Sequence, residues 1–211
     1  GTGATIDVGA GGSIALKAGG NLDMDGSLVA RGGEVELAIL GQRGAAAGTN
    51  STDFEPYGYL KDQHIGLGEN ALIDVSGIVK SYRPGGASDA RLFGEVLGGG
   101  TVTLGSANGT PQRGRLLMNA KASIKLDGAS GDLDFGRFVD RQRVSAAAGT
   151  LNIGLTDGFE LLGNLSAKAP DATVAGGTVN IALSQERLID RSQSVDYPKD
   201  GVAGSDGTIP D

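Results

Sequence analysis

Apolar residues recur at every second position in short segments of this chain, and glycines stand on both sides of these segments. In the segment 11–16 (GGSIAL), Ile14 and Leu16 are two positions apart and are separated by a small residue. A period of two is typical of a β-strand with one buried face, because successive side chains point to opposite sides of the strand. Each segment therefore predicts a short strand. The glycines predict the turns, since glycine adopts positive φ without a steric penalty.

Two motifs of this kind alternate along the chain. The first has a small residue and Gly followed by x-apolar-x-apolar, and it occurs at 11–16, 32–37, 99–104, 148–153 and 176–181. The second is apolar-x-apolar-x-Gly, and it occurs at 22–26, 73–77, 124–128 and 159–163, with a partial copy at Ile6. A third, weaker motif, Gly-polar-Leu-x-Ala, follows at 26–30 and 163–167. The first two copies of the first motif start 21 residues apart (32 − 11), which is room for three short strands.

This repeat predicts an all-β protein, a parallel β-solenoid of about five coils over residues 1–183. One such coil cannot bury its inward side chains alone, whereas stacked coils bury them together. Like residues then stack in ladders, of which the first is Ile14, Val35, Val102, Leu151 and Val179. The neighbouring ladder is Leu16, Leu37, Leu104, Ile153 and Ile181, and a corner ladder is expected from Gly26, Gly77, Gly128 and Gly163.

An antiparallel sandwich is the competing architecture. Its hairpins would turn at the dipeptides Asp25-Gly26, Asn108-Gly109, Asp127-Gly128 and Asp157-Gly158, which favour two-residue turns. The alternation of two distinct motifs favours the solenoid, because a sandwich has no reason to keep it.

Irregular segments interrupt the repeat. Excursions are predicted near 41–67, 78–97 and 129–147, the second with a helical turn in SDARLFGEVL, and 184–211 is expected to be an irregular tail, cap or linker. Eight of the nine aromatic residues lie outside the regular strands. These rings either cover the solenoid wall or form contact residues, since Tyr and Phe are favoured at interfaces. The candidate binding residues are the loop aromatics Phe54, Tyr57, Tyr59, Tyr82 and Phe138.

Composition narrows the classes of function. The chain has 38 glycines in 211 residues, only 4% aromatic residues, and no cysteine, which excludes disulfides and thiolate metal sites. Its net charge of −7 disfavours nucleic acid as a partner, and no apolar run is long enough to predict a transmembrane segment. Because the chain starts GTGATIDV, without Met, we expect a piece of a longer protein.

Candidate chemistry is sparse. His64, the only histidine, has no triad signature around it and is expected to be a solvated loop residue. Polysaccharide lyases and hydrolases built on β-solenoids use acidic clusters with a basic residue. One such set is present: Asp132, Asp134 and Asp140, near Arg137, Arg141 and Arg143. A surface ion-pair loop explains the same residues, so no catalytic residue is assigned.

The second motif also places Asp7, Asp23 and Asp74 at equivalent outward positions. Stacked like charges are unfavourable, and a bound cation would relieve the repulsion. Solvent at the surface screens it as well, and the chain lacks the nonapeptide of calcium-binding repeats. We therefore predict no metal and no cofactor.

The segment 11–33, GGSIALKAGGNLDMDGSLVARGG, resembles the repeats of the filamentous haemagglutinin family, the large exoproteins of bacterial two-partner secretion. The likeness is weaker at 68–77, 98–104, 118–128 and 148–181. The resemblance implies a right-handed parallel β-helix with three short strands per coil. It also implies a secreted rod at the Gram-negative cell surface, associated with the outer membrane and exported through an outer-membrane transporter partner.

The function expected from these observations is structural and adhesive. The coils would hold the shape of a rod, and its loops would bind a receptor or glycan on a host or neighbouring bacterial cell. Two alternatives remain open: a carbohydrate-active β-helix enzyme, and a passive spacer in the stalk of a contact-dependent toxin.

Overall fold

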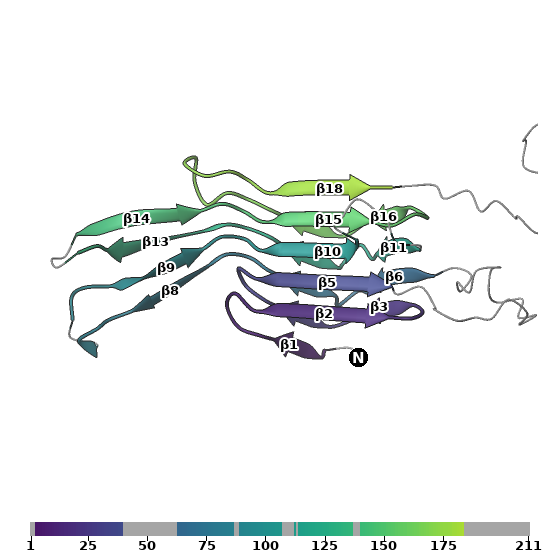
Figure 1. Ribbon diagram of the computed structural model, residues 1–211, viewed down its shortest axis with the longest axis horizontal. Coiled ribbons are helices and arrows are strands. Elements are labelled where there is room, and N and C mark those ends of the chain that lie inside the picture. The colour runs from purple at the N-terminus through teal and green to yellow at the C-terminus, as the bar shows by residue number, and fades with distance from the viewer. Residues whose placement is uncertain are drawn as a thin grey trace, which may run out of the picture.

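The computed structural model describes residues 3–39, 63–86, 89–106, 112, 114–136 and 140–183. These residues form β-strands joined by turns, with no α-helix among them. Fourteen strands form three parallel sheets, and four more form two antiparallel hairpins that extend from one side of the sheets (Figure 1). The all-β class with parallel sheets is thus confirmed, and the antiparallel sandwich was the wrong alternative.

The chain visits the three sheets in a fixed cycle. Sheet A contains β1 (Thr5–Asp7), β4 (Ser27–Val29), β7 (Leu72–Asp74), β12 (Ser123–Lys125) and β17 (Asn164–Ser166). Sheet B contains β2 (Ser13–Ala18), β5 (Glu34–Ile39), β10 (Thr101–Gly105), β15 (Thr150–Gly154) and β18 (Thr178–Ala182). Sheet C contains β3 (Leu22–Met24), β6 (His64–Leu67), β11 (Arg115–Met118) and β16 (Phe159–Leu161). We call one passage through sheets A, B and C a coil.

The core consists of the aliphatic side chains that point inward from the three sheets. In sheet B, Val35 pairs with Val102 and Leu37 pairs with Leu104, and all four side chains are buried. Both predicted ladders are confirmed over their full length, from β2 to β18. The parallel register therefore places each apolar residue of the first motif directly on its equivalent in the next coil.

The predicted corner ladder of four glycines is wrong, because the second motif occurs in two different sheets. Its copies at 22–26 and 159–163 include strands of sheet C, whereas those at 73–77 and 124–128 include strands of sheet A. Gly26 accepts a hydrogen bond from the N–H of Leu72, so the residue above it is Ala71 rather than Gly77. Short inward strands share the apolar-x-apolar pattern in every sheet, so the pattern does not identify the sheet.

A different column of glycines is required by the packing. Gly33, Gly100 and Gly149 precede the sheet B strands of consecutive coils, and a Cβ atom on any of them would lie under 3.0 Å from the carbonyl oxygen of the glycine one coil earlier. A side chain here would hold the coils apart. This close approach explains why the second residue of the first motif is always glycine.

The second and third predicted excursions each contain a β-hairpin. The segment 78–97 contains β8 (Ile78–Tyr82) and β9 (Phe93–Leu97), which form a hairpin. The segment 129–147 contains the hairpin of β13 (Ala129–Asp134) and β14 (Arg141–Ala146).

Two details of these expectations are wrong. The expected helical turn does not form, because Phe93–Leu97 pairs with β8 as a strand. The first excursion ends earlier than expected, since His64–Leu67 is strand β6 of sheet C. Residues 40–62 and the tail 184–211 lie outside the described residues.

Replacement of a ladder residue should destabilise the protein strongly. Leu104 is fully buried between Leu37 and Ile153. We expect Leu104→Ala to lower the free energy of unfolding by about 2–5 kcal/mol, because it removes buried methyl groups and leaves a cavity. Urea unfolding followed by circular dichroism measures this change. Leu162→Ala is the matched control, because Leu162 is 60% exposed, and an equal loss in both variants would contradict the stacked core.

Gly100→Ala tests the close approach of the coils. The added methyl group would collide with backbone, which cannot move without separating two strands, so the cost should reach or exceed about 3 kcal/mol. Gly19→Ala is the control, because a Cβ atom at Gly19 would meet no atom within 4 Å. Comparable melting temperatures for the two variants would contradict the assigned stacking.

Candidate functional site

The two hairpins pack face to face and form one unit, which we call the hairpin platform (β8, β9, β13 and β14). Leu133 is buried in this platform. A Cβ atom on Gly131 would lie 2.9 Å from the methyl groups of Val79, so glycine is needed for the approach of β13 to β8. The N–H of Asp134 also donates a hydrogen bond to the carbonyl oxygen of Leu92, at 2.8 Å. The hairpins are thus joined by apolar packing and by a main-chain bond.

Asp134 fixes how the two hairpins are aligned. Its side chain is buried, and its Oδ2 accepts hydrogen bonds from the N–H of Leu92 (2.6 Å) and the guanidinium of Arg141 (2.7 Å). Arg141 also donates to the carbonyl oxygen of Ala90, at 3.1 Å. The bonds from Arg141 and from the Leu92 N–H lower the pKa of Asp134 below its usual value. The carboxylate is therefore ionised at neutral pH.

A second ion pair shapes the chain between β8 and β9. Arg91 binds both oxygens of Asp89, at 3.1 and 2.8 Å, and its guanidinium carbon lies 5.7 Å from the centre of the Phe93 ring. The N–H of Gly85 donates to the same carboxylate. The side-chain bond from Arg91 is the main reason that the pKa of Asp89 falls well below its usual range. The ring of Phe93 is thus held from one side by a cation.

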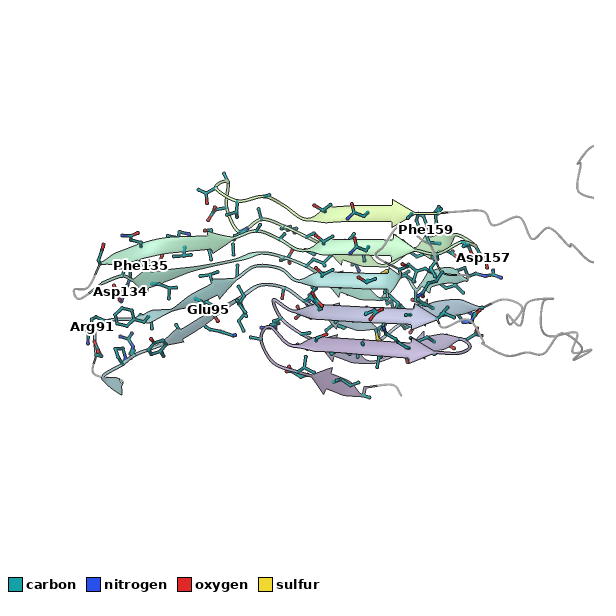
Figure 2. The ribbon with its side chains drawn as sticks, viewed as in Figure 1. Arg91, Glu95, Asp134, Phe135, Asp157 and Phe159 are labelled. Atoms are coloured by element: carbon teal, nitrogen blue, oxygen red, sulfur yellow. The ribbon has the colours of Figure 1, made fainter. Side chains whose placement is uncertain are left out.

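A groove of about 500 Å³ opens beside these anchors, and we call it the hairpin groove. Tyr82 and Phe93 stand directly opposite each other on β8 and β9, with ring centres 6.2 Å apart and planes tilted by 37°. Phe135, which follows β13, lines the groove from the other hairpin (Figure 2). Tyr82 is 63% exposed and Phe135 is 46% exposed. Lys80 and Glu95 form an ion pair of 3.3 Å in the same groove.

The structure places one of the five candidate binding residues. Tyr82 is exposed in the hairpin groove. The other four, Phe54, Tyr57, Tyr59 and Phe138, lie outside the described residues. Sequence reasoning missed Phe93 and Phe135 as members of the same groove. The sequence predicted a helical turn around Phe93, and only the hairpin register shows that Phe93 faces Tyr82.

The acidic cluster does not form a catalytic pair. Each carboxylate of β13 faces its own arginine on β14: Asp134 lies 2.7 Å from Arg141, and Asp132 lies 4.0 Å from Arg143. Because the pKa of Asp134 is lowered, this residue has no proton to give as a general acid at neutral pH. The arrangement disfavours the hydrolase alternative at this position. Asp140 directly precedes β14, and Arg137 lies outside the described residues.

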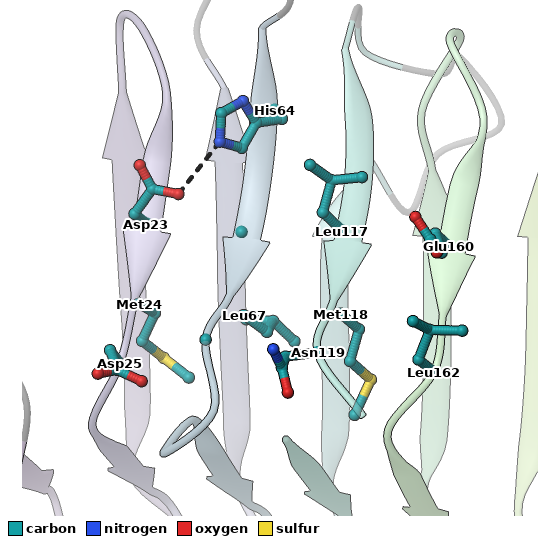
Figure 3. A pocket seen from close by; sticks show the side chains of 12 residues that line it. Asp23, Met24, Asp25, His64, Leu67, Leu117, Met118, Asn119, Glu160 and Leu162 are labelled. Atoms are coloured by element: carbon teal, nitrogen blue, oxygen red, sulfur yellow. Dashed lines mark hydrogen bonds and ion pairs between the residues drawn. The ribbon is translucent and has the colours of Figure 1, made fainter. Parts of the chain in front are cut away.

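His64 is in a strand, so the expectation of a solvated loop residue is wrong. It begins β6, and its Nε2 lies 3.1 Å from Oδ1 of Asp23 on the neighbouring strand β3 (Figure 3). The two residues line an open hollow of about 500 Å³ on sheet C, together with Leu117 and Glu160. Gly66 lies between Asp23 and Leu117 in the ladder and leaves this space free.

The predicted stack of Asp7, Asp23 and Asp74 does not form. Asp7 and Asp74 belong to sheet A with Val29 between them, and Asp23 belongs to sheet C. Asp74 is buried, accepts hydrogen bonds from the N–H and hydroxyl of Ser76, and lies 3.4 Å from Arg31. Within the described part of the chain, no group of three or more His, Cys, Asp or Glu side chains is arranged to hold a metal ion.

Comparisons of the chain with protein-family models, with curated proteins and with solved structures found no match. Over the residues that the structure describes, no helix has the length and apolar character needed to span a membrane.

Asp171 connects the platform to the loop that leads into β18. It accepts hydrogen bonds from the hydroxyl of Ser145 on β14 and from the N–H and hydroxyl of Thr173, and Arg143 lies 3.7 Å away. These bonds, above all that from Ser145, lower the pKa of Asp171 to about 2. The folded protein therefore stabilises the ionised form of the Asp171 carboxyl group.

Acid should weaken this connection in a defined pH range. Because the pKa of Asp171 is lower in the folded than in the unfolded chain, its contribution is complete above about pH 4 and is lost as the pH falls toward 2. We expect Asp171→Asn to reduce the slope of unfolding free energy against pH between 4 and 2, as measured by urea unfolding. Thr173→Val, which removes one donor, should reduce the slope only in part. An unchanged slope in Asp171→Asn would contradict the assigned bonds.

Proposed function

We propose that the chain is a segment of a right-handed β-solenoid rod in which sheets A, B and C are the three walls. The cyclic order of the strands supports this proposal, because a chain that passes A, B and C repeatedly in the same order winds around one axis. The continuous aliphatic ladders support it as well, since they fill the space between the walls.

The proposed function of this rod is adhesion. The hairpin platform would present the hairpin groove to a receptor or glycan on a host or neighbouring bacterial cell. The observation that carries this proposal is the pair of exposed rings, Tyr82 and Phe135, on a projection that two buried or paired aspartates hold in place. Exposed aromatic side chains on rigid elements lose little entropy on binding and form most of the strong contacts at interfaces.

The resemblance of 11–33 to filamentous haemagglutinin repeats extends the proposal to location and export. On this basis the rod belongs to a secreted exoprotein at the Gram-negative cell surface, and an outer-membrane transporter is its partner during secretion. The alternative function, a passive spacer in a toxin stalk, would use the same rod architecture but would need no binding surface.

Binding to a glycan array and to intact host and bacterial cells tests the adhesive function. The labelled chain should bind, and Tyr82→Ala and Phe135→Ala should each raise the dissociation constant about 30-fold, the equivalent of about 2 kcal/mol for one truncated aromatic contact. Phe159→Ala is the matched control, because Phe159 is a partly exposed ring at the opposite end of the molecule (Figure 2).

The outcomes separate the alternatives. No binding by the unaltered chain would favour the passive spacer. Equal losses in all three variants would exclude the hairpin groove as the contact. Release of new reducing ends from a bound polysaccharide would replace adhesion by the enzymatic alternative.

A further inference from the structure

The hairpin groove combines an aromatic pair with an ion pair on one face of a hairpin. Lys80 and Tyr82 are two positions apart on β8, and they stand opposite Glu95 and Phe93 on β9. All four side chains therefore point to the same side of the hairpin. The two ring centres are 6.2 Å apart, and Nζ of Lys80 lies 3.3 Å from Oε1 of Glu95. The groove thus offers a ligand an apolar surface beside a hydrogen-bonding pair.

Every charged side chain that lines the groove is already paired. These side chains are Lys80, Glu95 and Asp134. Lys80 and Glu95 pair with each other, and Asp134 pairs with Arg141 at 2.7 Å. A charged group of a ligand would therefore meet a charge of its own sign about as closely as one of the opposite sign. Electrostatic attraction to an ion in the groove is weak for this reason.

Neither sign of ligand charge is favoured at the aromatic pair. The guanidinium carbon of Arg91 already lies 5.7 Å from the centre of the Phe93 ring, so a ligand cation would be repelled where the ring would otherwise attract it. Oδ1 of Asp134 is buried and has no hydrogen-bond donor among the described residues, which disfavours a ligand anion beside it. The charge of Arg83 also acts on Asp134, but Arg83 is not among the residues that line the groove.

A purely apolar ligand fits no better. It would cover Lys80 and Glu95, whose side chains are 43% and 59% exposed, and would leave them without the hydrogen bonds that water now supplies. The ligand therefore needs an apolar face for the rings and both donors and acceptors for the ion pair. A sugar ring has these features, because its C–H groups form an apolar face and its hydroxyl groups both donate and accept.

The spacing of the ion pair also suits a sugar. Hydroxyl oxygens on neighbouring carbons of a sugar ring lie about one hydrogen-bond length apart. The 3.3 Å between Nζ of Lys80 and Oε1 of Glu95 is similar. One hydroxyl can therefore accept a hydrogen bond from the ammonium group of Lys80 while its neighbour donates one to the carboxylate of Glu95.

We propose that the hairpin groove binds an uncharged saccharide, with a sugar ring against Tyr82 and two neighbouring hydroxyl groups on Lys80 and Glu95. This inference rests on the proposed adhesive role of the same groove and names the class of its ligand. The groove volume of about 500 Å³ is within the range typical of small-ligand sites.

A glycan array of matched pairs tests the charge of the ligand. Each pair contains a neutral glycan and its sialylated or sulfated form. The unaltered chain should bind the neutral member of a pair more tightly. Isothermal titration calorimetry with that glycan should give a dissociation constant that changes less than about twofold between about 0.05 and 0.5 M salt, because binding neutralises no charge.

Two variants test the hydroxyl contacts. Glu95→Met and Lys80→Met each remove one partner and should raise the dissociation constant for the neutral glycan about 10-fold or more. Their selectivity should differ: Glu95→Met leaves the charge of Lys80 unpaired, so this variant should bind the acidic glycan better than the unaltered chain does, whereas Lys80→Met should not. A general loss of structure would not produce this difference.

The matched control is Glu36→Met. It breaks the ion pair of Lys17 and Glu36 on sheet B, which has a separation of 3.0 Å and side chains 45% and 38% exposed. This variant should bind the neutral glycan as the unaltered chain does, because the pair is not part of the hairpin groove.

The outcomes separate this inference from the adhesive function. A preference for the acidic glycans, or an unchanged affinity in both groove variants, would overturn the inference, even where the loss of binding in Tyr82→Ala still supports adhesion through the groove. Cell binding that requires Tyr82 but persists after enzymatic removal of the cell-surface glycans would assign the groove to a protein receptor and would also overturn it. No binding by the unaltered chain would overturn both proposals.

Discussion

Parallel stacking in one fixed register is the constraint on which the rest of this structure depends. The inward and outward positions alternate along each strand, so a shift by one residue would turn every ladder side chain outward. The column of Gly33, Gly100 and Gly149 allows the main chains of consecutive coils to come close at the start of each sheet B strand. The aliphatic ladder begins two residues later, at Val35, Val102 and Leu151. Glycine spacing and burial of apolar side chains therefore select the same register.

The same register explains how two separate insertions form one platform. The first hairpin lies between β7 of sheet A and β10 of sheet B, and the second lies between β12 and β15 of the same two sheets. Stacking of the coils places these corners on top of each other: a Cβ atom on Gly77 would lie 2.9 Å from the N–H nitrogen of Ala129. The loop that contains Asp171 lies at this corner as well, one coil further on, and bonds to Ser145. Stacking of the coils thus brings together two insertions that start 51 residues apart in sequence (129 − 78).

The sequence predicted the strands that repeat from coil to coil, and it missed the features that depend on contacts between insertions. The ladders of sheet B could be assigned residue by residue, because a small residue followed by Gly marks the start of each strand. The strands of sheets A and C could not be separated, since both carry apolar-x-apolar without a distinguishing residue. Asp23 and His64 are 41 positions apart in sequence, and no local sequence signal indicates that they pair. Phe93 and Phe135 join the groove through the hairpin register and the packing of β9 against β13, neither of which repeats.

The anchors of the platform serve alignment more than stability. Apolar packing, such as that of Val79 against Gly131, is not directional, so it holds the hairpins together without fixing their relative position. A buried carboxylate is costly unless its bonds are made, which penalises every alignment of the hairpins that moves Asp134 away from the Leu92 N–H. Because Phe135 follows Asp134 directly in sequence, this one alignment also sets where its ring stands relative to Tyr82 and Phe93. A groove formed by two hairpins can select a ligand only if its two sides are held in one arrangement. The bonds of Asp134 to Leu92 and of Arg141 to Ala90 supply that condition, because they join the two hairpins.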